Sequence, residues 1–90
     1  MSMITIVATG GFDPIHSGHI EYLKEASSCG TNLVVGVNSD DWLVRKKGRY
    51  FMPWDERAAI ISALTCVDKV IAFDDSDETA IDCLEQVKKL

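Results

Sequence analysis

Three short runs of apolar residues stand out along the chain, and each is rich in β-branched side chains. They span residues 3–8 (MITIVA), 33–37 (LVVGV) and 69–73 (KVIAF). Continuous apolar runs of this length, without polar alternation, are typical of strands that helices cover on both faces. The pattern therefore predicts three buried parallel strands.

Between and after these runs, apolar residues recur every three or four positions, which is the spacing of a helix face. The predicted helices span residues 17–28, 54–64 and 77–89. Gly30 follows the first as a stop signal, and Pro53 precedes the second. Residues 38–52 are polar, and we expect a long loop there, which in a compact domain is usually functional or mobile.

The order of these elements is β-α-β-α-β-α, with the polar loop after the second strand. Right-handed crossovers between parallel strands place helices on the faces of the sheet. We therefore expect an α/β fold, a Rossmann-like three-layer α/β/α arrangement around a parallel sheet. With 90 residues, the chain is predicted to form one small domain over residues 1–90.

The formal net charge is −5, which argues against non-specific nucleic-acid binding because that needs a basic surface. No apolar run approaches the roughly 20 residues of a membrane span, and the N-terminus lacks the features of a secretory signal. The three cysteines form no CxxC or Cys/His cluster. We expect a cytoplasmic protein with reduced thiols and without a nucleic-acid or membrane partner.

The segment between the first strand and the first helix is rich in glycine (GGFDPIHSGH, residues 10–19). In open α/β sheets, ligands bind beyond the carboxyl ends of the strands, where this segment lies. Gly10 and Gly11 allow a tight turn and close approach to a bulky anion, and Gly18 does the same at the helix entry. Together with the free N–H groups and dipole of the helix, they predict an anion site.

Two histidines, His16 and His19, flank Gly18 in this loop. An imidazole can donate a hydrogen bond to a phosphate oxygen, and its ordinary pKa makes both charge states accessible. Otherwise, a histidine here packs or caps the helix. A zinc site lacks a suitable third ligand, because Asp13 is the only candidate nearby in the sequence. The loop therefore predicts a phosphate site.

The stretch TGGFDPIHSGH closely resembles the HxGH signature of the nucleotidyltransferase superfamily, which includes cytidylyltransferases, adenylyltransferases and, more distantly, class I aminoacyl-tRNA synthetases. The stretches VGVNSDDWLVRKKGR and MPWDERAAIISALTCVDKVIAF are similar to glycerol-3-phosphate cytidylyltransferases and to the heptose-phosphate adenylyltransferase domain. The resemblance covers essentially the whole chain.

The resemblance implies transfer of a CMP or AMP group from CTP or ATP to a phosphorylated polyol or sugar, with release of pyrophosphate. His16 and His19 would contact the triphosphate and stabilise the transition state. The backbone at Gly11 and Phe12 would line the nucleotide site, and Asp13 would hold the loop or lie near the metal-bound phosphates. Mg²⁺ would arrive with the triphosphate, so no dedicated metal site is expected.

In the resembled family, a phosphate-binding lysine follows the second strand, and Lys46 takes that position, with Lys47 able to share its role. The alternative is a solvated surface lysine. Arg57 matches an arginine at the start of the next helix, whose planar fork suits bidentate phosphate contact. An ion pair with Asp55 or Glu56 is the alternative for Arg57.

Asp40 follows the second strand, and we expect it either to bind hydroxyls of the acceptor or to cap the loop. Members of the resembled family usually continue with further strands and a second signature of the RTxGxSTT type, which nothing in this chain matches. The first strand is therefore expected to have an unpaired edge. We expect either a fragment of a longer enzyme or a chain that completes its sheet by association, as a homodimer. The alternative function is a truncated or non-catalytic nucleotide-binding or assembly domain.

Overall fold

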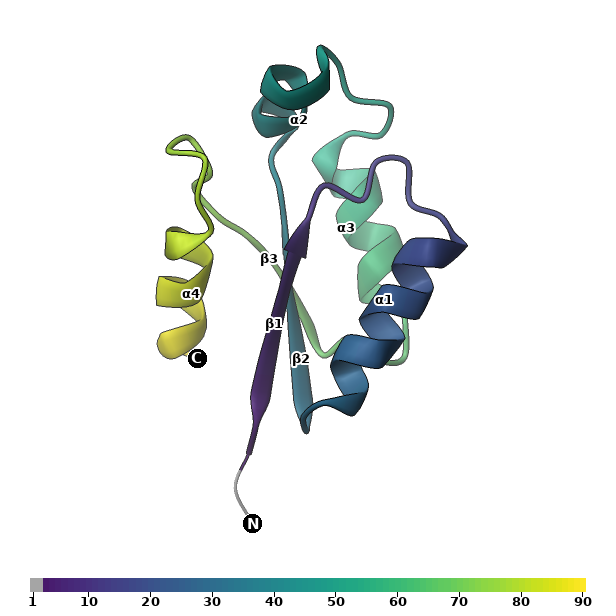
Figure 1. Cartoon of the computed structure of the whole chain (residues 1–90), viewed down its shortest axis with the longest axis vertical. Helices are drawn as coiled ribbons and strands as arrows, with labels where there is room; N and C mark the ends of the chain where they lie inside the picture. Colours follow the sequence, from purple (N-terminus) through teal and green to yellow (C-terminus); the bar gives the residue numbers. More distant parts are fainter. Residues whose placement is uncertain (1–2) are drawn as a thin grey trace.

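The computed structural model describes residues 3–90 of the chain. It contains three strands and four helices (Figure 1). Their bounds are β1 Thr5–Gly10, α1 Ser17–Ser28, β2 Asn32–Val37, α2 Asp40–Lys47, α3 Trp54–Ser62, β3 Lys69–Ala72 and α4 Ile81–Lys88.

The strands form one parallel sheet in the order β1-β2-β3. Gly10 of β1 pairs with Val37 of β2, and Val37 pairs with Ala72 of β3, so the carboxyl ends of all three strands lie at one edge. The apolar residues of the central strand are almost completely buried, as its continuous apolar sequence predicts. Within residues 3–90, β1 and β3 each pair on one side only.

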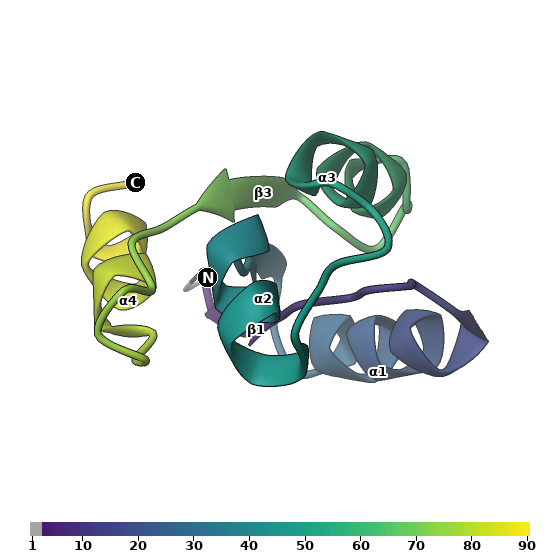
Figure 2. The ribbon, with the colours of Figure 1, turned by 90° about the horizontal axis from the view of Figure 1, so that it is seen from above.

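Helices cover both faces of the sheet, which confirms the predicted three-layer arrangement (Figures 1 and 2). On one face, Leu23 of α1 and Ile61 of α3 pack against Val35. On the other face, Cys83 of α4 packs against Val34 and its neighbours. This second contact is close, because a Cβ atom at Gly36 of β2 would lie only 2.5 Å from the sulfur of Cys83.

The expectation of a continuous loop over residues 38–52 is wrong, because residues 40–47 form helix α2. Ser39 caps its N-terminus by accepting a hydrogen bond from the backbone N–H of Trp42. Two aspartates lie in its first turn and three cations in its last, which complements the helix dipole. Gly48 ends the helix with a left-handed φ of 85°.

Several element boundaries also differ from the prediction. The first strand spans Thr5–Gly10 rather than residues 3–8. The last helix begins at Ile81 rather than at residue 77. The residues before it form local turns instead, in which Asp77 accepts hydrogen bonds from the N–H and hydroxyl of Thr79. Such side-chain bonds compete with helix formation and delay its start.

Candidate active site

The first loop leaves β1 at the edge where the strands end, and buried Phe12 anchors it. Phe12 is 4% exposed and has a positive φ of 53°. Its ring lies beneath Gly10, where a Cβ atom would come within 3.1 Å of Phe12 Cζ. Gly11 faces α2, where a Cβ atom would lie 2.8 Å from Leu43 Cδ2. Because Gly10 and Gly11 have no Cβ atom, the side chains of Phe12 and Leu43 can lie against the backbone at these positions.

His16 and His19 form a reciprocal cap at the start of α1. Nδ1 of His16 accepts from the N–H of Gly18 at 3.0 Å, and Nδ1 of His19 accepts from the N–H of His16 at 3.1 Å. The two rings lie with centroids 4.0 Å apart. A neutral imidazole that accepts through Nδ1 carries its proton on Nε2. The cap therefore fixes both rings as Nε2–H donors. Capping was expected as an alternative to phosphate binding, but the two roles use different nitrogens and are compatible.

The acidity of His19 follows from its surroundings. Partial burial, followed by the neighbouring His16 ring, lowers the pKa of His19 from its usual value. Both effects disfavour the charged ring, and a protonated Nδ1 also cannot accept the capping hydrogen bond. The folded domain therefore holds His19 as the neutral donor over a wider pH range than the unfolded chain does.

This lowered pKa predicts a pH dependence of stability. As the pH falls through about 6.5, the unfolded chain takes up a proton at His19 before the folded domain does. The free energy of unfolding should therefore be highest above this pH, decline below it, and level off beneath the folded pKa. Urea denaturation at a series of pH values measures the decline. The control is His19→Gln, because glutamine in this position can accept the same hydrogen bond without titrating; an unchanged decline in that variant would assign it to other groups.

Asp13 fastens the segment before α3 to the first loop. Its carboxylate accepts from the backbone N–H groups of Phe51 and Met52, both at 2.7 Å. Lys47 donates to the Asp13 carbonyl oxygen at 2.5 Å and lies 3.3 Å from its carboxylate. Burial alone raises the pKa of Asp13, but these hydrogen bonds outweigh it and the net pKa is lowered. Of the two roles expected for Asp13, holding the loop is the one that the structure displays.

Arg57 is completely buried and joins four segments around the site. Its guanidinium donates to the carbonyl oxygens of Gly11 at 2.8 Å, Asn38 at 2.7 Å and, through Nε, Met52 at 2.9 Å. It also contacts the Asp40 carboxylate at 2.6 Å. The ion-pair partner is therefore Asp40 rather than the neighbours Asp55 or Glu56, which corrects the sequence-based alternative. A phosphate contact by Arg57 stays a prediction, and it would require the guanidinium to leave these acceptors.

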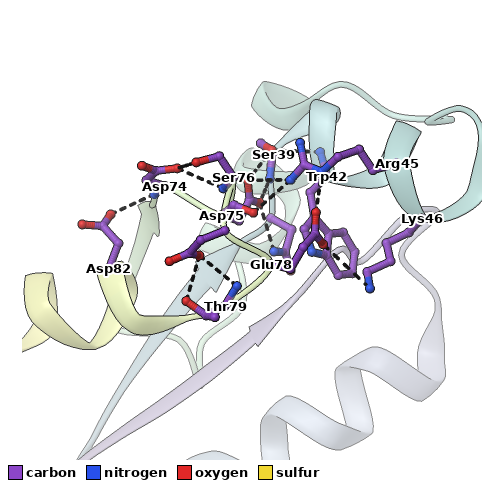
Figure 3. Close-up of polar contacts among 12 residues, drawn as sticks. Ser39, Trp42, Arg45, Lys46, Asp74, Asp75, Ser76, Glu78, Thr79 and Asp82 are labelled. Atoms are coloured by element: carbon purple, nitrogen blue, oxygen red, sulfur yellow. Dashed lines mark hydrogen bonds and ion pairs between the residues drawn. The ribbon is translucent and has the colours of Figure 1, made fainter.

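Besides Lys47, helix α2 carries Arg45 and Lys46, and these two cations face an acidic segment that precedes α4 (Figure 3). Arg45 contacts the Glu78 carboxylate at 2.5 Å, and Lys46 lies 3.8 Å from it. Lys46 also lies over the Trp42 ring, 5.6 Å from its centroid. In this arrangement Lys46 is paired with Glu78 and lies on a different side of α2 from the contact that Lys47 makes with the first loop.

Asp75 is a buried residue of the site that the sequence did not single out. It is 4% exposed and accepts from the side chain of Asn38 and from both the N–H and the hydroxyl of Ser39 (Figure 3). Burial raises its pKa, but these hydrogen bonds, that from the Ser39 N–H foremost, lower it overall. Asp75 thereby fixes the residues between β2 and α2. Its only sequence signal is its place in an acidic run after the third strand.

Two cavities open near the carboxyl ends of the strands. The larger has a volume of about 350 Å³, lies past the ends of β2 and β3, and is lined by residues that include Val37, Phe73, Trp54, Asp40 and Asp41. The smaller, of about 160 Å³, lies on the side of α4. Asp40 therefore begins α2, pairs with Arg57 and also borders the larger cavity. This position is compatible with both roles expected of Asp40, the binding of acceptor hydroxyls and the capping of the loop.

Within residues 3–90, no three His, Cys, Asp or Glu side chains are grouped so that they would hold a metal ion. In the same part of the chain, none of the helices has the length and apolar character needed to cross a membrane.

The family model for cytidylyltransferase-like domains matches residues 7–89, which is nearly the entire chain. The chain belongs to the cytidylyltransferase-like family. This assignment agrees with the predicted resemblance and with the position of the histidine loop at the carboxyl end of β1.

Individual members of the family show how far the likeness extends. A bifunctional protein HldE of Geobacter metallireducens is 44% identical over 86 residues, which are 92% of this chain and 17% of that protein. A FAD synthase of Archaeoglobus profundus is 44% identical over 83% of this chain and 48% of its own length. The chain thus spans about a sixth of the HldE proteins that it matches.

A solved structure supports the fold directly. The crystal structure of a lipopolysaccharide core biosynthesis protein from Thermoplasma volcanium superposes with a TM-score of 0.79 at 39% sequence identity. The match covers 89% of this chain and 67% of that one. The cytidylyltransferase-like domain described here therefore shares the fold of this protein over nearly all its own length.

Proposed function

We propose that this cytidylyltransferase-like domain is the catalytic part of a nucleotidyltransferase that moves a CMP or AMP group from CTP or ATP to a phosphorylated polyol or sugar. An oxygen of the acceptor phosphate attacks the α-phosphorus, the bond from that phosphorus to its bridging oxygen breaks, and pyrophosphate leaves with the electron pair. The observation that carries the proposal is the pair of oriented Nε2–H donors of His16 and His19 at the N-terminus of α1.

These donors suit the chemistry because phosphoryl transfer needs positioning and charge stabilisation rather than a protein nucleophile. Charge builds on the non-bridging oxygens of the α-phosphate, and donors that are already oriented stabilise it without reorganisation. The positive end of the α1 dipole adds to this effect. Gly18 leaves room for the His16 ring, since a Cβ atom there would lie 2.8 Å from its Cε1.

Lys46 would join the triphosphate from α2. Its present partner does not hold it strongly, because the ion pair with Glu78 spans 3.8 Å between side chains that are 54% and 43% exposed. Exposed ion pairs of this kind contribute less than about 1 kcal/mol. Mg²⁺ would be brought by the triphosphate and offset its charge, which fits an ion that needs few protein ligands.

The acceptor proposal draws on the resemblance and on the relatives. One relative is named a FAD synthase, and the solved structure belongs to a lipopolysaccharide core biosynthesis protein. The first name refers to the synthesis of a dinucleotide and the second to that of a saccharide-bearing lipid, and the domain described here has the same fold as the second protein. We accordingly propose a phosphorylated polyol or sugar as the acceptor.

The proposal is tested by isothermal titration of the 90-residue chain with CTP and ATP, each in the presence of Mg²⁺. We expect one nucleotide to bind with clear preference, which identifies the base and leads to pyrophosphate-release assays with phosphorylated acceptors. Failure of both nucleotides to bind would contradict the proposal for this chain and show that a further segment is needed for the site.

A second candidate is a nucleotide-binding domain without catalytic activity. It is favoured because the residues expected to bind phosphate already have partners within the domain. Arg57 donates to four acceptors, and Lys46 faces Glu78. Nucleotide binding without pyrophosphate release, for every acceptor tried, would support this candidate.

A further inference from the structure

We propose that Glu78 is an exchangeable substitute for phosphate, which holds Lys46 in the nucleotide-free domain and yields it to the triphosphate on binding. This inference rests on the transferase function proposed above and concerns the regulation of the same site. The carboxylate and the triphosphate compete for one ammonium group. Nucleotide affinity is therefore set in part by a carboxylate that does not contact the nucleotide.

Glu78 faces two cations of α2, with one carboxylate oxygen toward each (Figure 3). Its Oε1 accepts from Nε of Arg45 at 2.5 Å, and its Oε2 lies 3.8 Å from Nζ of Lys46. The first contact is a charge-assisted hydrogen bond, whereas the second is an ion pair beyond hydrogen-bond distance. Arg45 therefore fixes the carboxylate, and Lys46 is the partner that can be exchanged.

Trp42 connects the ammonium group of Lys46 to the first loop. Nζ of Lys46 lies over the Trp42 ring, 5.6 Å from its centroid. The same ring lies against Gly11, where a Cβ atom would come within 3.4 Å of Trp42 Cζ3. The side chain of Lys46 is exposed, so it can change its rotamer without unpacking the core. We therefore place the exchange in the side chain of Lys46 rather than in a movement of α2.

The turn that carries Glu78 has a fixed base at Asp75. The N–H of Glu78 donates to the Asp75 carbonyl oxygen at 3.0 Å, and the same oxygen accepts from Arg45 at 2.9 Å. Asp75 itself is buried and accepts from the N–H of Ser39, just before α2. The carboxylate of Glu78 can therefore keep its position beside α2 when Lys46 leaves it.

Glu78 also has a backbone conformation that a glutamate rarely adopts. Its φ is 64°, in the left-handed region where glycine and asparagine are favoured. A residue other than glycine is held in this region only where its surroundings determine it, and such residues cluster at functional sites. The surroundings here are the contacts of its N–H and of its carboxylate. The side chain, rather than the backbone, accounts for a glutamate at this position.

The strength of the contacts suits an exchange. Arg45, Lys46 and Glu78 all have exposed side chains. Ion pairs between exposed side chains are weak, so a triphosphate with several negative charges can displace the carboxylate. The upper limit for such a pair corresponds to about a fivefold difference in affinity. Removal of the carboxylate should therefore strengthen nucleotide binding measurably but modestly.

Isothermal titration of the 90-residue chain with MgATP, MgCTP and inorganic tripolyphosphate tests the exchange. In the variant Glu78→Gln, we expect about threefold to fivefold tighter binding of each ligand that binds the original chain. Glu78→Asn should give the same gain, and it tolerates the left-handed backbone if the glutamine variant folds poorly. The matched control is Glu85→Gln, which changes the net charge equally at an exposed position of α4 and should leave the affinity unchanged.

Lys46→Ala separates the exchange from simple repulsion of the nucleotide. In this background Glu78→Gln should no longer change the affinity, because the cation for which the two anions compete is gone. An equal gain with and without Lys46, or an equal gain from Glu85→Gln, would overturn the inference.

The three ligands also distinguish this inference from the transferase function. Nucleotide binding that Glu78→Gln leaves unchanged overturns the exchange alone. A gain for tripolyphosphate in Glu78→Gln, together with failure of both nucleotides to bind, supports the exchange and contradicts the transferase function. Failure of all three ligands to bind overturns both.

Discussion

Replacement of Arg57 by methionine is expected to lower the free energy of unfolding by about 3–5 kcal/mol. The guanidinium is completely buried and satisfies the carboxylate of Asp40 and three backbone carbonyl oxygens. Methionine fills similar space but donates no hydrogen bond, so these acceptors lose their partner inside the domain. Urea denaturation monitored by circular dichroism measures the loss.

The matched control for this prediction is Arg49→Met. Arg49 is exposed and lies over the Phe51 ring, 4.6 Å from its centroid, so the same substitution there should change stability by less than about 0.5 kcal/mol. Similar midpoints for the two variants would show that the buried contacts of Arg57 contribute little. Arg57→Lys addresses the phosphate role, because a lysine keeps the positive charge but not the planar fork. If Arg57 binds phosphate directly, the affinity for nucleotide should fall by more than the loss of folded protein accounts for.

The strands and the first helix could be predicted from the sequence because their signals are local. Continuous apolar runs identified β2 and β3 closely, and Gly30 lies just beyond α1 as the stop signal indicates. Helix α2 was missed because the prediction relied on an apolar stripe, and only Leu43 of its eight residues is buried. Its signals are instead the N-cap Ser39, the charge order and Gly48.

The connections of the site were harder to predict because they join residues distant in the sequence. Asp55 and Glu56 are neighbours of Arg57 in the chain, yet the sheet and α2 bring Asp40 to it from 17 positions away. Asp75 reaches Ser39 across 36 positions. Such pairings depend on how the elements pack, which periodicity and spacing in one sequence do not specify.

The histidine loop shows what a motif does and does not predict. The sequence presented capping and phosphate binding as alternative roles for His16 and His19. In the structure, Nδ1 of each ring accepts a capping hydrogen bond and leaves Nε2–H as a donor, so the capping role does not exclude the predicted phosphate contact. The spacing of an N-cap residue and the third residue of the helix is that of a capping box, so this was a signal in the sequence.

Replacement of either His16 or His19 by alanine is expected to slow nucleotidyl transfer about a hundredfold, which corresponds to about 3 kcal/mol of transition-state stabilisation. Each alanine should also lower the free energy of unfolding by about 1 kcal/mol, because each removes one capping hydrogen bond of α1. Pyrophosphate release measures the first effect, and urea denaturation measures the second.

The two effects are separated by variants that keep the cap. Asparagine is a favoured N-cap residue and glutamine is favoured at the third helical position, so His16→Asn and His19→Gln should restore stability to within about 0.5 kcal/mol of the original chain. Neither side chain replaces an Nε2–H donor at the same position, so transfer should stay about a hundredfold slower. If transfer recovered together with stability, the histidines would serve only to cap α1. If transfer stayed slow in the folded variants, the loss would belong to the Nε2–H donors, because the helix that positions them would be intact.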